Sequence, residues 1–165
     1  MDGKTKNIAA SVHQRLLNKS RESSRPFNEL LQHFAIERFI YRLSESPHAD
    51  SFILKGALMF AAWIGSMSRP TMDIDLLGKI ENSLELIITV IKDACSMEVE
   101  NDGIVFHKGT VTAASITEDA GYKGARVMLR GNLGKIKLFL RIDIGFGDSL
   151  IKQNLAMHRH RSKMW

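Results

Sequence analysis

The fold is decided by residues 51–78, SFILKGALMFAAWIGSMSRPTMDIDLLG. Short apolar runs separated by glycine and proline predict strands and a helix joined by tight connections. In chain order the predicted elements are a strand at Phe52–Leu54, a turn at Lys55–Ala57, a short helix at 58–64, a loop through Arg69–Thr71, and a second strand from Asp73. The rest of the chain is interpreted around this strand–helix–strand unit.

Two carboxylates lie on the second strand. Side chains of a strand alternate between faces, so Asp73 and Asp75 are expected on the same face. Carboxylates this close repel unless they bind a cation or share a proton. Magnesium selects oxygen ligands and retains waters and substrate phosphates as further ligands. The pair therefore indicates either a magnesium–nucleotide site or an acidic strand end that faces water.

The turn before the predicted helix favours the first interpretation. Gly56 followed by the small Ala57 would let a phosphate approach backbone N–H groups and the helix N-terminus. Carboxylates on the next strand could then hold magnesium against the same phosphate.

A third carboxylate lies in the last predicted strand. In residues 137–147, KLFLRIDIGFG, Asp143 interrupts an apolar run. Alternation places Phe139, Arg141 and Asp143 on the face opposite Leu138, Leu140, Ile142 and Ile144. A carboxylate in such a strand is costly to bury unless it is paired or binds a metal. Asp143 thus either forms a salt bridge with Arg141 or another cation, or completes a site with Asp73 and Asp75.

The remaining pattern predicts an α/β (α+β) domain. Apolar spacing indicates an N-terminal helical pair, Ile8 to about Lys19 and Pro26 to Leu43, and a well-buried helix from Asn82 or Ser83 to Cys95. Further strands are predicted at 103–106, 111–116, 125–129 and 136–146, with turns at 101–103, 118–121 and 131–134. Helices and a β-α-β unit followed by a β-meander indicate a mixed sheet with flanking helices.

Composition sets the class of protein. With 165 residues, 44% hydrophobic and 25% charged, the chain is expected to form one globular domain. No apolar run is long enough to span a membrane, and the N-terminus lacks a signal-peptide pattern. The single cysteine, Cys95, excludes an internal disulfide and is interpreted as a structural thiol rather than a nucleophile. A cytoplasmic location is expected.

The net charge of +5 is carried mainly by the C-terminal tail. After Asp148 the chain has four basic residues and no acidic ones, which leaves about +1 for the body. Arg38 and Arg42, one helical turn apart, could meet phosphate but are expected to pair with Glu37, Glu45 or solvent. A helical nucleic-acid-binding protein is therefore the weakest interpretation.

Several ordered motifs resemble the AbiEii/AbiGii toxin family of nucleotidyltransferases. They are Lys55–Gly56–Ala57 at the family's Lys-Gly-Gly turn, RPTMDID at 69–75, IDIGFGD at 142–148, and the preceding ERFIYRLSES at 37–46. The resemblance extends from about Pro26 to Asp148. It implies a nucleotidyltransferase-like lobe at 1–150, with 1–25 a helical extension and 151–165 a basic tail outside the family pattern.

The resemblance also implies a function. It implies a magnesium-dependent transferase that moves a nucleotide from a nucleoside triphosphate to an RNA such as tRNA, or to a protein, and that has a cognate antitoxin. Asp73, Asp75 and Asp143 take the catalytic and metal-ligand positions. The nucleotide-binding positions fall on Lys55, Gly56, Ala57, Arg69 and Thr71.

Two departures from the family leave an alternative open. Ala57 replaces a glycine, and alanine adopts positive φ at a cost. Family members also continue into a second, helical half with an Ala-Glu-Lys segment, whereas this chain is expected to be truncated and weakly active or inactive. The alternative is a non-catalytic remnant that binds nucleotide or antitoxin and forms homo-oligomers through the face left by the missing half.

Overall fold

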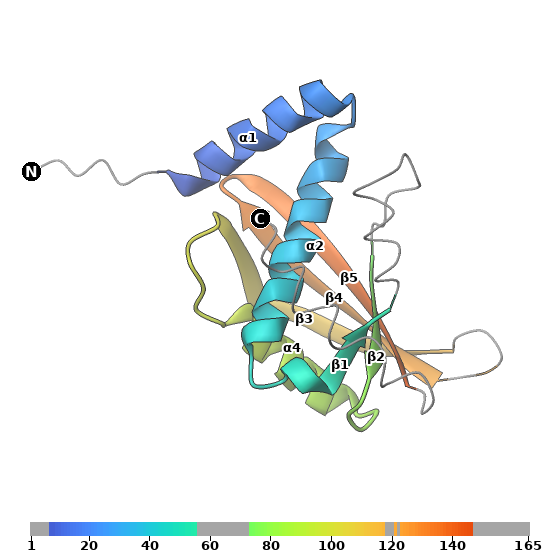
Figure 1. Ribbon diagram of the computed structural model, residues 1–165. Helices are drawn as coiled ribbons and strands as arrows, with labels where there is room; N and C mark the ends of the chain where they lie inside the picture. Colours follow the sequence, from blue (N-terminus) through green and yellow to red (C-terminus); the bar gives the residue numbers. More distant parts are fainter. Residues whose placement is uncertain (1–6, 56–72, 118–120, 122, 147–165) are drawn as a thin grey trace, which may run out of the picture.

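The computed structural model describes residues 7–55, 73–117, 121 and 123–146. In this described part of the chain, α-helices and a 3₁₀ turn pack with one β-sheet (Figure 1). The elements are α1 (Ile8–Ser23), α2 (Phe27–Glu45), η1 (Ala49–Ser51), β1 (Phe52–Leu54), β2 (Ile74–Gly78), α4 (Leu84–Cys95), β3 (Ile104–Thr117), β4 (Lys123–Leu133) and β5 (Ile136–Phe146). The predicted mixed sheet with helices is therefore present.

Over the residues that the structure describes, the sheet has five strands in the order β1-β2-β5-β4-β3. β2 and β5 are parallel, whereas β1 with β2, β5 with β4, and β4 with β3 are antiparallel. The meander β3–β4–β5 forms one side of the sheet, and the central stretch adds β1 and β2 to the other edge of β5. This order brings the strand containing Asp75 beside the strand containing Asp143.

One face of the sheet is covered by helices and forms the core. Leu138, Leu140, Ile142 and Ile144 are at most 6% exposed, while Phe139 on the opposite face is 45% exposed. The alternation predicted for this strand is therefore confirmed. Ile36 and Phe39 of α2, with Ile87 and Ile91 of α4, are fully buried against this face. The opposite face, called the open face below, carries the polar residues of the strands.

The helices differ from prediction at their ends and in burial. α1 continues past Lys19 to Ser23, where the Ser23 hydroxyl donates to the Lys19 carbonyl. Of the two residues predicted to begin this helix, Asn82 and Ser83, the N-cap is Ser83, whose hydroxyl accepts from the Leu86 N–H at 3.4 Å. α4 was expected to be well buried, but Leu86 is 38% exposed, and the buried residues Ile87, Val90, Ile91 and Ala94 lie on one side of the helix.

The meander also differs from prediction in strand length. The runs predicted at 103–106 and 111–116 form one strand, β3, whose pairing with β4 shifts register between His107 and Thr112. β4 extends through the predicted 131–134 turn to Leu133, so only residues 134–135 make the connection to β5. Gly131 belongs to the strand because a Cβ there would lie 2.5 Å from the Val105 carbonyl oxygen, and glycine permits this close pairing.

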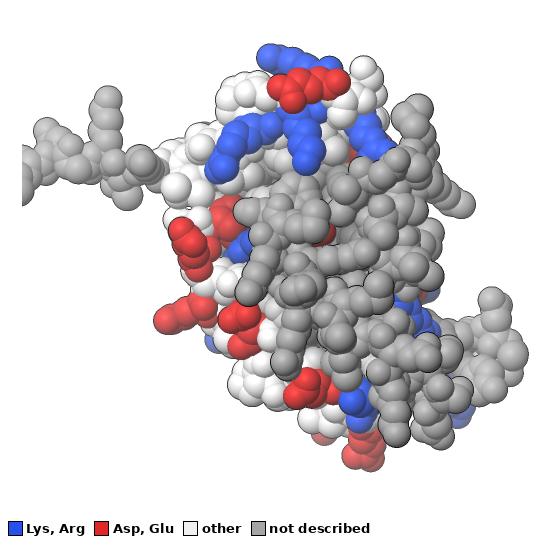
Figure 2. Space-filling view, in the orientation of Figure 1, with Lys and Arg blue, Asp and Glu red and all other residues white. Residues whose placement is uncertain are grey.

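The helical pair is docked on the end of the sheet. Val12 and Leu16 of α1 are buried in the same core as α2. Figure 1 shows α1 crossing above the β4–β5 hairpin, and a Cβ at Gly134 would lie 3.5 Å from Ala9. In Figure 2, Lys and Arg side chains gather at this α1 end of the visible face. None of the helices in the described ranges is long and apolar enough to cross a membrane.

Candidate functional site

Two of the predicted carboxylates occupy neighbouring positions on parallel strands. The register of β2 and β5 pairs Asp75 with Asp143. Neighbouring strands are about 4.8 Å apart, and paired residues of parallel strands project from the same face. Asp75 and Asp143 therefore project side by side from the open face, although 68 residues of sequence separate them.

Two arginines of the open face are ion-paired with carboxylates of this group. Arg126 of β4 donates through Nε to Asp143 Oδ1 at 2.9 Å and through a terminal nitrogen to Oδ2 at 3.2 Å. Arg141 of β5 donates to Asp73, which immediately precedes β2. The hydrogen bond with Asp143 raises the pKa of the Arg126 guanidinium, so this cation stays charged. Together these groups form the carboxylate–arginine cluster, defined as Asp73, Asp75, Asp143, Arg126 and Arg141.

Lys55, the first residue of the predicted phosphate-binding turn, lies next to the carboxylate–arginine cluster. The Lys55 backbone N–H donates to the Asp75 carbonyl at 2.9 Å, which extends the β1–β2 pairing by one residue. Lys55 thus follows β1 directly beside the second carboxylate. The other predicted nucleotide-binding residues, Gly56, Ala57, Arg69 and Thr71, lie outside the described residues.

The donor chemistry of the cluster fits a hard cation. All three predicted ligands are carboxylates, the ligand type that magnesium prefers. Arg126 engages each oxygen of Asp143 once, and each carboxylate oxygen has two lone pairs, so acceptor capacity remains. Within the described ranges, no three His, Cys, Asp or Glu side chains are grouped as a metal site. Two of these carboxylates, Asp143 and Asp73, are ion-paired with the guanidinium groups of Arg126 and Arg141.

Arg126 is the residue of this site that sequence analysis missed. A salt bridge of Asp143 with Arg141 or another cation was one of the two alternatives for this carboxylate, and the cation that it contacts is Arg126, its cross-strand neighbour in the β4–β5 register. Arg141 instead reaches Asp73. A hairpin closing at residues 134–135 places Arg126 opposite Asp143, whereas the turn predicted at 131–134 gives a different register, so the sequence prediction could not have found the pair.

Arg38 and Arg42 form a separate ion-pair group with a partner that was not predicted. Arg38 Nε donates to Asp102 Oδ2 at 2.6 Å, and Arg42 donates to both oxygens of Asp102 at 2.8 and 3.0 Å. The expected partners Glu37 and Glu45 are therefore wrong for this pair. Burial alone would raise the pKa of Asp102, but hydrogen bonds from Arg42 and Arg38 outweigh it and hold the pKa below its usual value.

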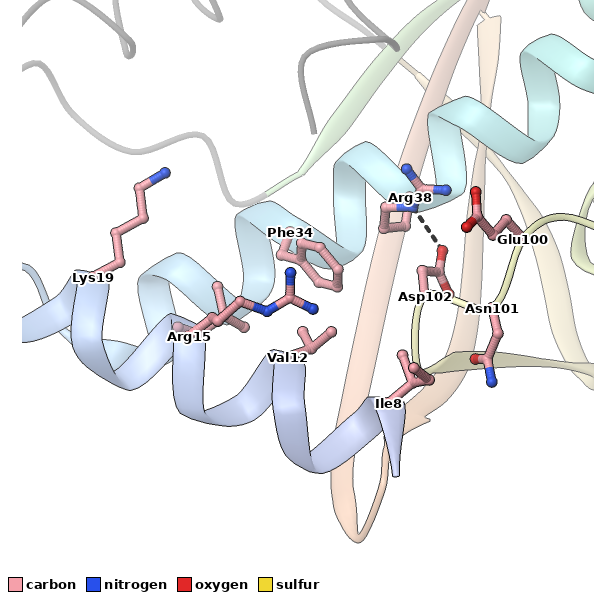
Figure 3. Close-up of a pocket in the computed structure, with 10 residues that line it drawn as sticks. Ile8, Val12, Arg15, Lys19, Phe34, Arg38, Glu100, Asn101 and Asp102 are labelled. Carbon is pink, nitrogen blue, oxygen red and sulfur yellow. Dashed lines mark hydrogen bonds and ion pairs between the residues drawn. The ribbon is translucent and has the colours of Figure 1, made fainter. Parts of the chain in front are cut away.

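A pocket of about 420 Å³ lies next to this ion-pair group. Figure 3 shows it between α1, α2 and the turn before β3, with the Arg38–Asp102 contact at one side. Its wall includes Val12, Leu16 and Phe34, and among the described residues of the predicted site, Lys55, Asp73, Asp75 and Asp143, none lines it. The pocket and the carboxylate–arginine cluster are thus different places on the molecule.

A known protein family matches the part of the chain that contains the carboxylate–arginine cluster. The family model described as "Nucleotidyl transferase AbiEii toxin, Type IV TA system" matches residues 38–160, which is well over half of the chain. The chain belongs to the AbiEii nucleotidyltransferase toxin family. The AbiEii match includes both strands that carry Asp75 and Asp143, and also the segment between them.

Two solved structures from Helicobacter pylori are similar to the AbiEii chain. One, described as a candidate nucleotidyltransferase, is 18% identical over 77% of this chain and 47% of its own, with a TM-score of 0.41. The other, JHP933, is 18% identical over 74% of this chain and 45% of its own, with a TM-score of 0.43. The chain therefore spans about half the length of these two proteins. No curated protein matches the chain.

Proposed function

We propose that this chain carries the metal-binding carboxylates of a magnesium-dependent nucleotidyltransferase. The donor substrate is a nucleoside triphosphate and the acceptor is an RNA, with tRNA as the first candidate. As a member of a toxin–antitoxin family, the chain is proposed to act as the toxin and to have a cognate antitoxin as its protein partner.

One observation carries the proposal. Asp75 and Asp143 are register partners on parallel strands, in a chain whose family transfers nucleotides. Two carboxylates at this spacing need positive charge nearby. Asp73 adds a third carboxylate next to the same strand end. Carboxylates on adjacent strands are suited to binding the cation that accompanies a triphosphate.

Each residue has a proposed role. Asp73, Asp75 and Asp143 would hold magnesium, which when bound stabilises charge on the attacking and leaving oxygens during in-line transfer. Lys55, Gly56 and Ala57 would contact the phosphates, with Arg69 and Thr71 near the nucleotide. The guanidinium groups of Arg126 and Arg141 lie within reach of the same carboxylates and would orient them and neutralise phosphate charge.

Labelled transfer tests the activity. The full chain is incubated with each nucleoside triphosphate labelled at the α-phosphate, magnesium and total tRNA, and label in RNA is measured. We expect weak transfer that is lost in Asp75→Asn. Asp93→Asn is a matched control, because Asp93 is an exposed aspartate on α4 that pairs only with His48 in the described contacts. Equal labelling by wild type and Asp75→Asn would contradict the proposal.

Calorimetry tests the metal site without activity. Magnesium is titrated into wild type, Asp143→Asn and Asp93→Asn in the presence of a non-hydrolysable triphosphate. We expect weaker binding only in Asp143→Asn. Indistinguishable isotherms for all three proteins would remove Asp143 from the metal site.

The ion pairs favour a second candidate function. Because Arg126 and Arg141 already balance Asp143 and Asp73, the carboxylates could be structural, and the chain a nucleotide- or antitoxin-binding module without catalysis. This candidate predicts triphosphate binding that persists in Asp75→Asn together with no labelled RNA from any variant. The labelling and calorimetric results therefore separate the two candidates.

A further inference from the structure

The meander strands carry an unequal distribution of charge. β3, β4 and β5 contain Lys108, Lys123, Arg126, Arg130, Lys137 and Arg141, whereas Asp143 is their one acidic residue. The low net charge of the whole body hides this segregation, because acidic residues elsewhere cancel it. Half of the sheet is thus basic, and Asp143 lies at the end of it next to β2.

Sheet register arranges these residues in rows across the open face. The row at the carboxylate end contains Ala114, Arg126, Asp143 and Asp75. The second row contains Thr112, Met128 and Arg141, and the third contains His107, Arg130 and Phe139. The fourth row contains Val105, Asn132 and Lys137. Successive rows are two residues apart along a strand, or about 6.6 Å. The rows lead from the carboxylates across the basic half of the sheet.

An aromatic ring is exposed in the third row. Phe139 is 45% exposed, and Val105 in the next row is 51% exposed. Phe139 pairs across the strands with Arg130, and its neighbours along β5 on the same face are Lys137 and Arg141. Four residues of strand separate Phe139 from Asp143, which corresponds to about 13 Å.

An exposed aromatic ring surrounded by cations on a sheet suits one class of ligand, single-stranded nucleic acid. Nucleobases stack on such rings irrespective of sequence, and neighbouring Arg and Lys side chains bind the phosphates. An acidic protein would also complement the positive charge of this surface, but it has no base that could stack on the exposed phenyl ring between the cations. A duplex hides the faces of its bases, so the complement is a single strand.

We propose that the open face of β3, β4 and β5 binds the single-stranded end of a nucleic-acid acceptor, with one base stacked on Phe139. Arg130 and Lys137 bind its phosphates, and the strand runs along the rows toward Asp143. This inference rests on the proposed transferase function for its direction, but the binding itself requires neither metal nor triphosphate.

Fluorescence anisotropy tests the surface. A fluorescein-labelled single-stranded RNA 10-mer is titrated with the full chain in EDTA without nucleotide, at several salt concentrations. Phe139→Ala should weaken binding by roughly 5- to 140-fold, the value of one base–aromatic stack, while Phe139→Tyr should retain it. Arg130→Gln should lower the slope of log affinity against log salt by about 0.7.

Leu86→Ala is the matched control, because Leu86 is a similarly exposed apolar residue on α4, away from the open face. It should bind like wild type. The proposal is overturned if wild type does not bind the oligonucleotide, if Phe139→Ala binds equally well, or if Leu86→Ala is weakened as much. Loss of labelling in Asp75→Asn with oligonucleotide binding intact identifies a failure in transfer chemistry rather than in this surface.

Discussion

Substituting Asp102 by alanine should strongly destabilise the fold. Its carboxylate accepts three hydrogen bonds from Arg38 and Arg42 at 2.6 to 3.0 Å and one from the Ile104 N–H at 3.1 Å. The Arg42 and Asp102 side chains are only 6% and 10% exposed. Removing the carboxylate would leave two guanidinium groups in a largely dehydrated place without their anion.

The size of the effect follows from this burial. Removing one partner of a buried ion pair costs about 3–5 kcal/mol, because the remaining charge is uncompensated. For a chain of this length, each kcal/mol lowers Tm by roughly 2–4 °C, so a fall of about 6–20 °C is expected. The free energy of unfolding is measured by urea titration with far-UV circular dichroism, and Tm by a thermal scan of the same samples.

A matched substitution separates this effect from general loss of charge. The Asp93 carboxylate also contacts a basic side chain, with His48 Nε2 at 2.8 Å from its Oδ2, but the Asp93 side chain is 53% exposed. Asp93→Ala should therefore cost no more than about 1 kcal/mol. If Asp102→Ala costs less than about 1 kcal/mol, or no more than Asp93→Ala, the buried ion-pair group does not hold α2 against the turn before β3 and the reasoning is refuted.

Three further predictions concern buried groups. Burial lowers the pKa of His33 from 6.5 to about 4. Between these pH values the unfolded chain binds more protons than the folded chain, so the free energy of unfolding should fall by about 3 kcal/mol as pH drops from 6.5 toward 4. In urea titrations, His33→Leu should flatten this pH dependence. Burial raises the pKa of Cys95 from 9.0 to about 11; a disulfide reagent at pH 8 should modify the native thiol at least about 100-fold more slowly than in urea, and equal rates would contradict this. Gly131→Ala should lower the free energy of unfolding by about 1–3 kcal/mol, because its Cβ would lie 2.5 Å from the Val105 carbonyl oxygen. Gly109→Ala should be nearly neutral, because no atom lies within 4 Å of the Cβ position. Equal losses for the two variants would contradict this reasoning, since they would mean that the β3–β4 pairing shifts to accommodate the Cβ at little cost.

Much of the local structure could be predicted from neighbouring residues. The alternation from Leu138 to Ile144 decides which face of β5 is buried, and the serine before the apolar run at 84–95 decides where α4 begins. The motifs around 55–75 and 142–148 were also enough to indicate the family, which the match over residues 38–160 establishes. These signals are local because alternation, capping and turn chemistry each act over a few residues.

Strand ends were less predictable. Gly131 is a turn residue by composition, yet it lies inside β4, because the carbonyl of Val105 approaches too closely for a side chain. The two apolar runs of β3 were predicted as separate strands, but the meander pairs them continuously with β4 around one irregularity. The length of each strand therefore depends on its partner strand, and the sequence of one segment does not specify that partner.

What the sequence determined by itself is therefore the type of each element, its buried face and the residues that could do chemistry. Which of those residues meet was decided only by tertiary structure. Asp75 and Asp143 become neighbours through the parallel pairing of β2 with β5, and Asp102 reaches Arg42 across 60 residues. The physical reason is that charge pairing depends on distances of a few ångströms, and only the order and register of the strands bring segments so far apart in the chain that close together.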